Sequence, residues 1–293
     1  MFKKFILFLI ILISFSSCSF EYDKKLKISA TTWIGYTPLF YAKEKGWLDD
    51  VNIKLLNVSS LSENMYLFEA GNSDAFVGTQ YEYNILKKKD TSLKPIILLD
   101  RSYGGDIIMS NLSIKDLQNT TQTIDAYLEM DSINNTILQD FISSYHLKNK
   151  KINYINKDQT QIAILQAKNT QNPTIIVTYV PYNITLSKNG YQKIVSTKDG
   201  LELLVIDAMF TKTKTFHIHE QQFIALKKII DKSIDELKKD KREFYETIKP
   251  YMLNMNYDEF KEAINDIIWI NKEISPQLKK RIGDAKFPMR DLI

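Results

Sequence analysis

The stretch TWIGYTPLFYAKEKGWL, residues 32–48, carries the start and stop signals of a short helix that directly follows an apolar, strand-like segment. We expect that strand over residues 26–32. Thr37 is placed to cap the helix, Pro38 to occupy its first turn, and Gly46 to follow its end. A strand that passes at once into a capped helix is typical of α/β proteins.

Strand-like and helix-like segments alternate along the rest of the first 200 residues. Short runs rich in β-branched and apolar residues predict strands, and segments that open on capping residues predict helices. The expected strands are 26–32, 51–58, 75–78, 94–99, 107–110, 122–126, 152–155, 174–178 and 191–195. The expected helices are 37–46, 62–71, 79–89, 132–145, 160–168 and 181–189. This order predicts sheets with helices on both faces, arranged as two α/β lobes.

The pattern also predicts how the chain is divided. Lobe 1 is expected to cover residues 26–107 and lobe 2 residues 108–203. After an extended segment, 202–210, the chain is mostly helical, with helices expected around 223–237, 242–249, 257–268 and 275–283. Because these helices are short and amphipathic, they do not make a separate domain, and we expect residues 204–293 to return to lobe 1.

The first 25 residues read as a secretory leader followed by a tether. Lys3 and Lys4 precede an apolar run over 5–15, and small residues lead to Cys18, the only cysteine of the chain. The run is about half as long as a membrane-spanning helix. We therefore expect 1–17 to be a lipoprotein signal peptide, Cys18 to be lipidated, and 18–25 to be a tether at a membrane of the cell envelope or periplasm. An ordinary signal peptide with an incidental cysteine is the alternative.

Composition argues against several classes of function. The formal net charge is +4, and removal of the leader with Lys3 and Lys4 lowers it to +2. A charge this close to zero does not favour binding to nucleic acid. No phosphate loop, dinucleotide fingerprint, nucleophile elbow or zinc-protease motif occurs. His217 and His219 lack neighbouring cysteine or carboxylate partners, which makes a metal site a weak reading. We predict no catalytic residue, no metal and no cofactor, and hence a protein that is not an enzyme.

Four segments, taken in order, resemble one protein family. Besides residues 32–48, they are AGNSDA at 70–75, DRSYGGDII at 100–108 and VTYVPY at 177–182. They resemble the periplasmic substrate-binding proteins that serve ATP-binding-cassette (ABC) importers of the nitrate, sulfonate, taurine and thiamine-precursor group. The resemblance implies a type 2 periplasmic-binding-protein fold, with two lobes, mixed sheets, flanking helices and C-terminal helices packed on lobe 1. It also implies a monomer that captures a small solute between its lobes and delivers it to a permease and its ATPase.

Residues that follow the predicted strands are the candidate ligand-binding residues. Ligands of open α/β sheets bind at the carboxyl ends of strands, where helix N-termini point at them. The candidates are Trp33, Tyr36, Thr37, Thr79, Gln80, Ser102, Tyr103, Asp106, Ser132, Asn134, Tyr179 and Tyr182. Each also has a structural reading. The aromatic residues could pack in cores, Asp106 could bond to amides of the Gly104-Gly105 turn, and Ser132 and Asn134 could serve as helix caps.

Aromatic side chains prevail among these candidates, and Arg101 is the only arginine near them. An anion would favour arginine or several free N–H groups, which helix N-termini could supply. Aromatic walls together with Asp106 favour a flat or nitrogen-bearing organic molecule, so we expect a pyrimidine-like precursor or an amine ahead of a sulfonate or nitrate. The alternatives are a ligand-sensing lipoprotein that acts on a membrane receptor, and an enzyme of pyrimidine-precursor synthesis. The eukaryotic enzyme of that kind depends on a cysteine-rich motif, which this chain lacks.

Overall fold

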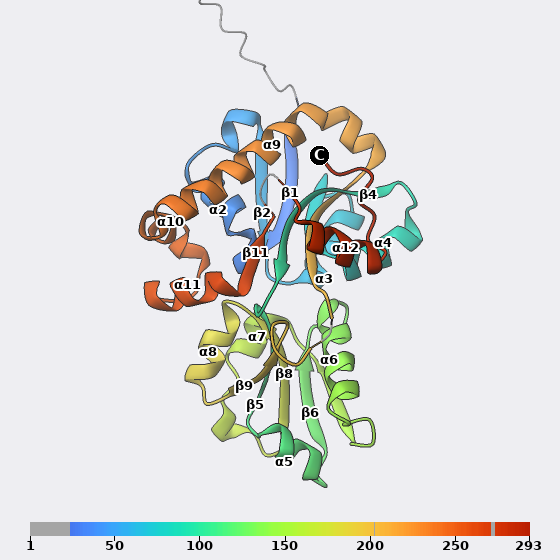
Figure 1. The fold of residues 1–293 in the computed structure, drawn as a ribbon, viewed down its shortest axis with the longest axis vertical. Coiled ribbons are helices and arrows are strands. Elements are labelled where there is room, and N and C mark those ends of the chain that lie inside the picture. The colour runs from blue at the N-terminus through green and yellow to red at the C-terminus, as the bar shows by residue number, and fades with distance from the viewer. Residues whose placement is uncertain (1–23, 202, 271–272) are drawn as a thin grey trace, which may run out of the picture.

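The chain folds into two α/β lobes, which stand one above the other in Figure 1. The structure is a computed structural model that describes residues 24–201, 203–270 and 273–293. The predicted leader, Cys18 and most of the predicted tether lie outside the described residues. Within the described part of the chain, no helix has both the length and the apolar character needed to cross a bilayer.

The upper lobe is built on a mixed six-stranded sheet. Its strands are β1 (Leu26–Thr31), β2 (Ile53–Val58), β3 (Ala75–Thr79), β4 (Leu93–Ser102), β10 (Ile206–Lys212) and β11 (Ile267–Trp269). In space they follow the order β11-β4-β10-β3-β1-β2. β1 is parallel to β2 and β3, whereas β10 is antiparallel to β3 and β4. The chain therefore leaves this sheet after β4 and returns to its middle through β10.

The lower lobe holds a mixed five-stranded sheet. Its strands are β5 (Asp106–Ser110), β6 (Ile124–Leu128), β7 (Ile152–Asn156), β8 (Thr174–Tyr179) and β9 (Gln192–Ser196), in the spatial order β7-β6-β8-β5-β9. β6 is parallel to β7 and β8, and β5 is antiparallel to β8 and β9. Two segments cross between the lobes, one from β4 to β5 and one from β9 to β10.

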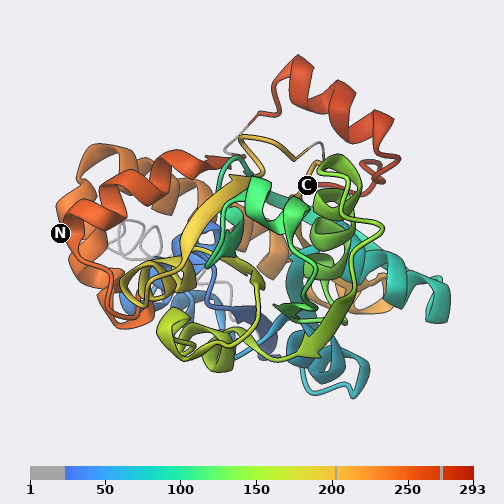
Figure 2. The same ribbon diagram turned by 90° about the horizontal axis from the view of Figure 1, so that it is seen from below.

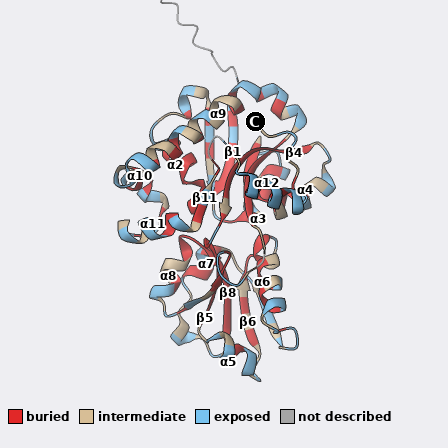
Figure 3. Ribbon diagram, viewed as in Figure 1, coloured by how far each residue is buried: buried red, intermediate tan, exposed pale blue. Residues whose placement is uncertain are grey.

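Helices cover both faces of each sheet. Those between the strands are α2 (Thr37–Glu44), α3 (Leu61–Glu69), α4 (Gln80–Lys89), α5 (Ile114–Asn119), α6 (Ile133–Ser144), α7 (Gln159–Ala163) and α8 (Tyr182–Lys188). The C-terminal helices are α9 (Thr213–Lys239), α10 (Lys241–Ile248), α11 (Tyr257–Ala263) and α12 (Pro276–Asp284). In Figure 3 the strands of both lobes are mostly buried, while the helices expose their outer faces. The predicted α/β architecture is therefore present.

Polar caps begin two helices where the sequence predicts them. Thr79 caps α4 in a capping box with Glu82, and Ser132 caps α6 by accepting from the Asn134 N–H. The prediction that Thr37 caps α2 is wrong. A short 3-10 turn, Ile34–Tyr36, comes first, so Thr37 already has helical dihedral angles and its hydroxyl donates to the Ile34 carbonyl at 2.7 Å.

The C-terminal helices pack on the upper lobe, as the sequence predicts, and they do so on both faces of its sheet. The apolar stripe of α9, which includes Phe223, Leu226 and Ile230, is buried with α2, α10 and α11. Leu278 and Ile282 of α12 join the opposite core layer, with α3, α4 and β10. Figure 2 shows this division, with the orange α10 and α11 on one side and the red α12 on another.

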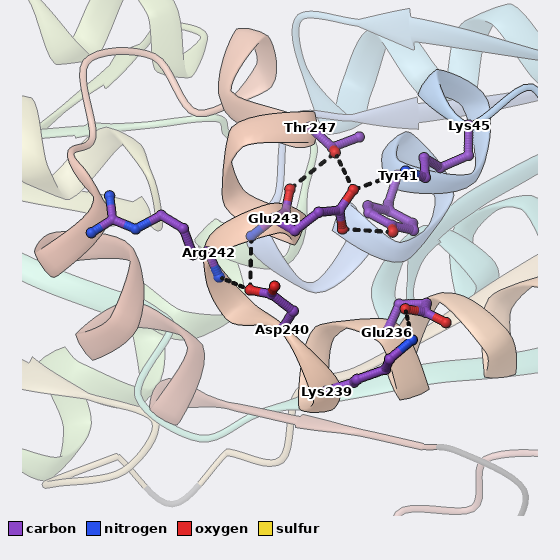
Figure 4. A network of polar contacts seen from close by, with 8 residues as sticks. All are labelled: Tyr41, Lys45, Glu236, Lys239, Asp240, Arg242, Glu243 and Thr247. Carbon is purple, nitrogen blue, oxygen red and sulfur yellow. Dashed lines mark hydrogen bonds and ion pairs between the residues drawn. The ribbon is translucent and has the colours of Figure 1, made fainter.

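One contact network fastens α10 to α2 (Figure 4). The ring of Phe244 stacks on Tyr41 with centroids 4.4 Å apart. The Tyr41 hydroxyl donates to Glu243 at 2.8 Å, and Lys45 pairs with the other oxygen of the same carboxylate at 2.8 Å. Asp240 caps α10, which explains why the charged run at 238–242 is a break between helices. The contact between α10 and α2 thus combines a buried ring pair, a hydrogen bond and an exposed ion pair.

The prediction of a helix over residues 257–268 is wrong for its last two residues, because a 3-10 turn, Ile264–Asp266, follows α11 and the helical path stops there. The helix α11 ends at Ala263, and Ile267–Trp269 forms β11 against the edge of β4. Ile267 and Ile268 are β-branched, and the β4 edge offers them unpaired backbone groups. The Trp269 side chain also donates to the Gly35 carbonyl at 2.9 Å, which ties β11 to the start of the first helix.

We expect Phe244→Ala to lower the free energy of unfolding by about 3–5 kcal/mol, because the ring is fully buried and stacked. Urea unfolding followed by circular dichroism measures the change. Lys45→Ala is the matched control, since its ion pair is 37% and 40% exposed and should contribute below about 1 kcal/mol. Similar losses in both variants would contradict this account of the α2–α10 contact.

Candidate functional site

A pocket lies where the two lobes meet, and its own side chains leave about 10 Å³ of it free, which is room for about one water molecule. Both lobes and one crossing contribute to it. Its lining residues are Thr31, Trp33, Tyr36, Leu61, Thr79, Asp106, Ile133, Tyr179, Val205 and Asp207. Thr31 and Thr79 are the last residues of β1 and β3, and Tyr179 is the last residue of β8. The pocket therefore sits at carboxyl ends of strands, where α/β folds bind ligands.

Three aromatic side chains form one wall of the pocket, and each is held in place. The rings of Trp33 and Tyr179 meet edge to face with centroids 5.7 Å apart. The Trp33 indole donates to Asp100 at 3.2 Å, and the Tyr36 hydroxyl donates to Asp207. All three aromatic residues are at most 5% exposed. Such rings can stack on a flat ligand or face a cation.

A glycine beneath the tryptophan makes this arrangement possible. A Cβ atom on Gly35 would lie 2.3 Å from the Trp33 indole nitrogen and 2.3 Å from an Asp100 oxygen. Gly105 is equally close on the other side, where a Cβ would lie 2.4 Å from the Trp33 ring. The WxGY and GGD patterns of the sequence thus belong to one packed unit, in which the indole lies between two glycine backbones.

Buried acidic side chains surround the pocket. Each of them either lines it or hydrogen-bonds to a residue that does, and each is at most 4% exposed. They are Glu82, Asp100, Asp106, Glu129 and Asp207. None of the ion pairs formed within the described residues includes any of them. Acidic groups are therefore concentrated here without a lysine or arginine paired to them among the described residues.

Burial raises the pKa of each of these carboxyl groups. It raises the pKa of Asp106 to about 7 and that of Glu129 to about 8. Asp100 and Asp207 lie opposite each other in the β4–β10 pairing. Burial is the main cause that raises the pKa of both, and the charge of Asp100 raises that of Asp207 further. The empty pocket therefore favours the protonated form of part of this cluster at neutral pH.

Several buried polar atoms at the pocket have no protein partner. They are one carboxylate oxygen of Asp106, the hydroxyl of Tyr179 and the hydroxyl of Thr31, all on lining residues. Buried polar groups are nearly always hydrogen-bonded, so unpartnered ones that face a pocket point to a ligand. The Asp106 oxygen and the Tyr179 hydroxyl belong to the lower lobe and Thr31 to the upper lobe, so one molecule between them would contact both lobes.

Five predicted site residues line the pocket, and the others do not. The five are Trp33, Tyr36, Thr79, Asp106 and Tyr179. Tyr182 is buried directly behind, edge to face with Tyr179 at 5.3 Å. Thr37 is inside α2, and Gln80 accepts from the Ile206 N–H at 3.0 Å, which fixes the second crossing.

The remaining candidates serve the crossings and the lower lobe. Ser102 bonds to Thr197 at 2.8 Å and accepts from the Asp106 N–H at 3.0 Å, so it joins the two crossings. Tyr103 is 37% exposed and lies 5.1 Å from the Arg101 guanidinium, outside the pocket. Ser132 caps α6, which is its structural reading, and Asn134 is buried with both polar atoms of its side chain unpartnered.

Sequence reasoning missed Asp207, Asp100, Glu82 and Glu129. A signal existed for Asp207, because it is the only charged residue in the apolar run LLVIDAMF at 203–210. Asp100 similarly ends the apolar run at 96–99, and Glu82 stands three residues after a predicted cap. The side chains of Glu82 and Glu129 accept hydrogen bonds from the opposite lobe, and no local sequence pattern predicts such a contact.

Among the described residues, no three His, Cys, Asp or Glu side chains are grouped so as to hold a metal ion. His219 is buried, and its Nδ1 lies 2.6 Å from the Gln222 side-chain oxygen. His219 is therefore part of the α9 packing against the upper lobe, whereas His217 is exposed.

No protein-family model and no curated protein sequence matches the chain. Solved structures do. One is the ligand-binding component of an ABC-type import system from Staphylococcus aureus with zinc bound, with 13% identity, a TM-score of 0.71, and 90% of this chain and 92% of that one covered. Another is the alkanesulfonate-binding protein SsuA from Xanthomonas axonopodis pv. citri bound to MOPS, with 11% identity, a TM-score of 0.67, and coverage of 89% and 91%.

The chain has the periplasmic-binding-protein fold. The periplasmic nitrate-binding protein NrtA from Synechocystis PCC 6803 is similar as well, with 12% identity, a TM-score of 0.60, and coverage of 83% of this chain and 69% of that one. The predicted fold class is thus confirmed, and the predicted resemblance to importer-associated binding proteins is confirmed at the level of the fold.

We expect the unliganded protein to lose stability as pH rises through 7. Asp106 and Glu129 have raised pKa values in the folded chain, so the folded state binds more protons than the unfolded state between about pH 4 and 8. The free energy of unfolding must fall across that window. Each kcal/mol lost lowers the melting temperature by about 2–4 °C in a domain of this size.

The matched variant for this prediction is Asp106→Asn, which carries no charge at any pH. Its melting temperature, measured by scanning calorimetry at pH 5.5 and pH 8.5, should fall less over that range than that of the unaltered protein. Parallel curves for the two proteins would contradict the assignment of a raised pKa to Asp106.

Proposed function

We propose that this protein captures a small organic solute with a positively charged nitrogen in the pocket between its lobes and delivers it to an ABC-type importer. One observation carries the choice of solute. The pocket gathers buried carboxyl groups without a basic partner among the described residues, and Asp106 keeps a buried oxygen unbonded. A ligand cation would supply the missing charge and the missing hydrogen bond.

The shape of the pocket adds to the choice. Three aromatic rings flank a pocket whose free space of about 10 Å³ holds about one water molecule, so an organic solute must displace side chains or part the lobes to enter. A flat ring with an amino group, such as an aminopyrimidine, would place its face against the aromatic side chains and donate its amino N–H to Asp106. A small aliphatic amine satisfies the same carboxylate. A sulfonate or nitrate would instead meet negative charge, which is why we rank them lower.

The two lobes give the pocket a way to open and close. In the part of the chain that the structure describes, two segments cross between them, and Ser102 joins these segments through Thr197. A rotation about the crossings would separate the lobes and admit the solute, and closure would then exclude water from it. We place the protein in the periplasm or cell envelope, anchored by a lipid on Cys18, with a permease and its ATPase as partners. It acts as a monomer and performs no chemical step on the solute.

Binding experiments test the proposed solute class. Isothermal titration calorimetry of the mature chain with primary amines and aminopyrimidines should give binding, and methanesulfonate or nitrate should not. Asp106→Asn should weaken amine binding by about 10- to 100-fold, as expected for a hydrogen bond to a charged group. Asp116→Asn is the control, because Asp116 lies at the start of α5 and bonds only locally to Ser113 at 2.6 Å. Binding of the sulfonate in place of every amine would contradict the proposal.

The affinity for a permanently cationic amine should depend on pH. Asp106, with a pKa of about 7, must lose its proton to pair with the ligand. Affinity should therefore rise by up to about tenfold per pH unit between pH 5 and 7 and level off above. The same titration with Asp106→Asn should be flat over this range, and a flat profile for the unaltered protein would remove Asp106 from the site.

The proposed anchor has its own test. Cys18→Ser removes the thiol that would carry the lipid, so the variant should move from the membrane fraction to the soluble fraction with unchanged ligand affinity. Fractionation followed by immunoblotting measures the distribution. Retention of Cys18→Ser in the membrane fraction would show that something other than a lipid at this position holds the protein.

A further inference from the structure

Two buried glutamates reach across the junction between the lobes, in opposite directions. Glu82 belongs to α4 of the upper lobe. Its Oε2 accepts from the Thr79 N–H at 2.8 Å, within the capping box of its own helix. Its Oε1 accepts from the Ile133 N–H at 3.0 Å, and Ile133 is the first residue of α6 in the lower lobe. One carboxylate thus serves the starts of two helices in two lobes.

Glu129 makes the reciprocal connection. It follows β6 in the lower lobe, and its Oε2 accepts from the N–H of Leu61, the first residue of α3 in the upper lobe, at 3.2 Å. Its Oε1 accepts from the N–H of Gln159, the first residue of α7, at 3.2 Å. Both glutamates are at most 2% exposed, and all these bonds are accepted by carboxylate oxygens. Hydrogen bonds of this charge-assisted kind are the strong ones in proteins.

The residues that donate these bonds include three that line the pocket. Leu61, Thr79 and Ile133 all contribute to its wall. The N-terminus of a helix, with its free N–H groups and its positive dipole end, is where a protein ordinarily holds an anion. Here one N–H group at the start of each of α3, α4 and α6 is already bonded to a carboxylate of the protein.

We propose that Glu82 and Glu129 are specificity-determining residues that fill, from across the junction, the helix N-termini at which an anionic solute would bind, and that they also hold the lobes together. The inference rests on the proposed role of this pocket as the solute site. An incoming anion would meet N–H donors that are already bonded to the protein's own carboxyl groups. A cation would instead favour the ionised form of these carboxyl groups and be attracted by it.

The closed arrangement gains from the same bonds. Separation of the lobes would break the Glu82–Ile133 and Glu129–Leu61 bonds and leave two helix starts without partners. At the rim, the Ser62 hydroxyl donates to the Asp131 carbonyl at 3.3 Å, and the Tyr66 hydroxyl donates to the Asp131 side chain at 3.2 Å. These rim bonds are exposed, so the two buried glutamates are the main polar attachment across this side of the junction.

The test uses Glu82→Gln, Glu129→Gln and the double variant of the mature chain. Glutamine keeps the shape but loses the charge, and its NH₂ group cannot accept from an N–H. Titration calorimetry with inorganic sulfate and with methanesulfonate should detect no binding to the unaltered protein. It should detect binding to the double variant, with at least a tenfold gain in affinity. Small-angle X-ray scattering without any ligand should give a larger radius of gyration for the double variant.

Glu63→Gln is the matched control. Glu63 sits in the first turn of α3 and accepts from the Ser59 N–H at 2.8 Å, but it is exposed and bonds within one lobe. It should change neither the affinity for sulfate nor the radius of gyration. A second variant, Glu129→Asp, keeps the charge and shortens the reach, so it should open the lobes without admitting sulfate. This variant keeps the inference testable even where Glu82→Gln does not fold.

The outcomes separate this inference from the proposed function. A folded double variant that binds sulfate no better than the unaltered protein overturns the selectivity role, and an unchanged radius of gyration overturns the attachment role. Neither measurement uses an organic amine. Failure of every amine to bind the unaltered protein would overturn the proposed function alone, provided that the sulfate and scattering results are as expected.

Discussion

The structure depends on how it keeps acidic side chains buried at the junction of its lobes without basic partners among the described residues. An unbalanced buried charge is costly, so each carboxyl group must find hydrogen-bond donors or keep its proton. Asp100 receives the Trp33 indole, Asp207 receives the Tyr36 hydroxyl, and the two glutamates receive backbone N–H groups at helix starts. Asp106 retains an unbonded oxygen. The cost of this arrangement is the reason to regard the junction as a ligand site, because a core selected for stability alone would carry apolar residues there.

The hydrogen bonds to these carboxyl groups also account for the backbone conformation around the pocket. The indole of Trp33 can reach Asp100 only because Gly35 and Gly105 leave room for it, and the 3-10 turn over Ile34–Tyr36 points the Tyr36 hydroxyl at β10. The helix starts at α3, α4 and α6 face the pocket because each follows a strand that ends there or a segment that passes beside it. Helix N-termini, which usually bind anionic ligands, are thus bonded here to acidic side chains of the protein itself.

The fold was largely predictable from the chain, and the site was predictable in part. Caps such as Thr79 and Ser132, and the apolar stripe of α9, act over a few residues and are visible in the sequence. The strand β11 was not, since Ile267 and Ile268 become a strand only because the edge of β4, far away in the chain, is free to pair. Trp33 and Tyr36 were found because they follow a strand, and Asp106 was found because it lies in the segment 100–108 that resembles the binding-protein family. Glu82 and Glu129 were missed because their roles arise only when two lobes meet, and Tyr103 was misleading because a residue at a strand end can still face solvent.

The position of β10 has a consequence for how the chain reaches its native state. This strand lies between β3 and β4, although the entire lower lobe separates it from them in sequence. The lower sheet is made from one continuous stretch and can assemble as soon as that stretch is available. The upper sheet cannot be completed until β10 has been made and pairs with β3 and β4. Long-range pairing of this kind is slow, and it leaves the edges of β3 and β4 unpaired until it occurs. During synthesis, the half-built upper lobe is therefore the species most exposed to aggregation.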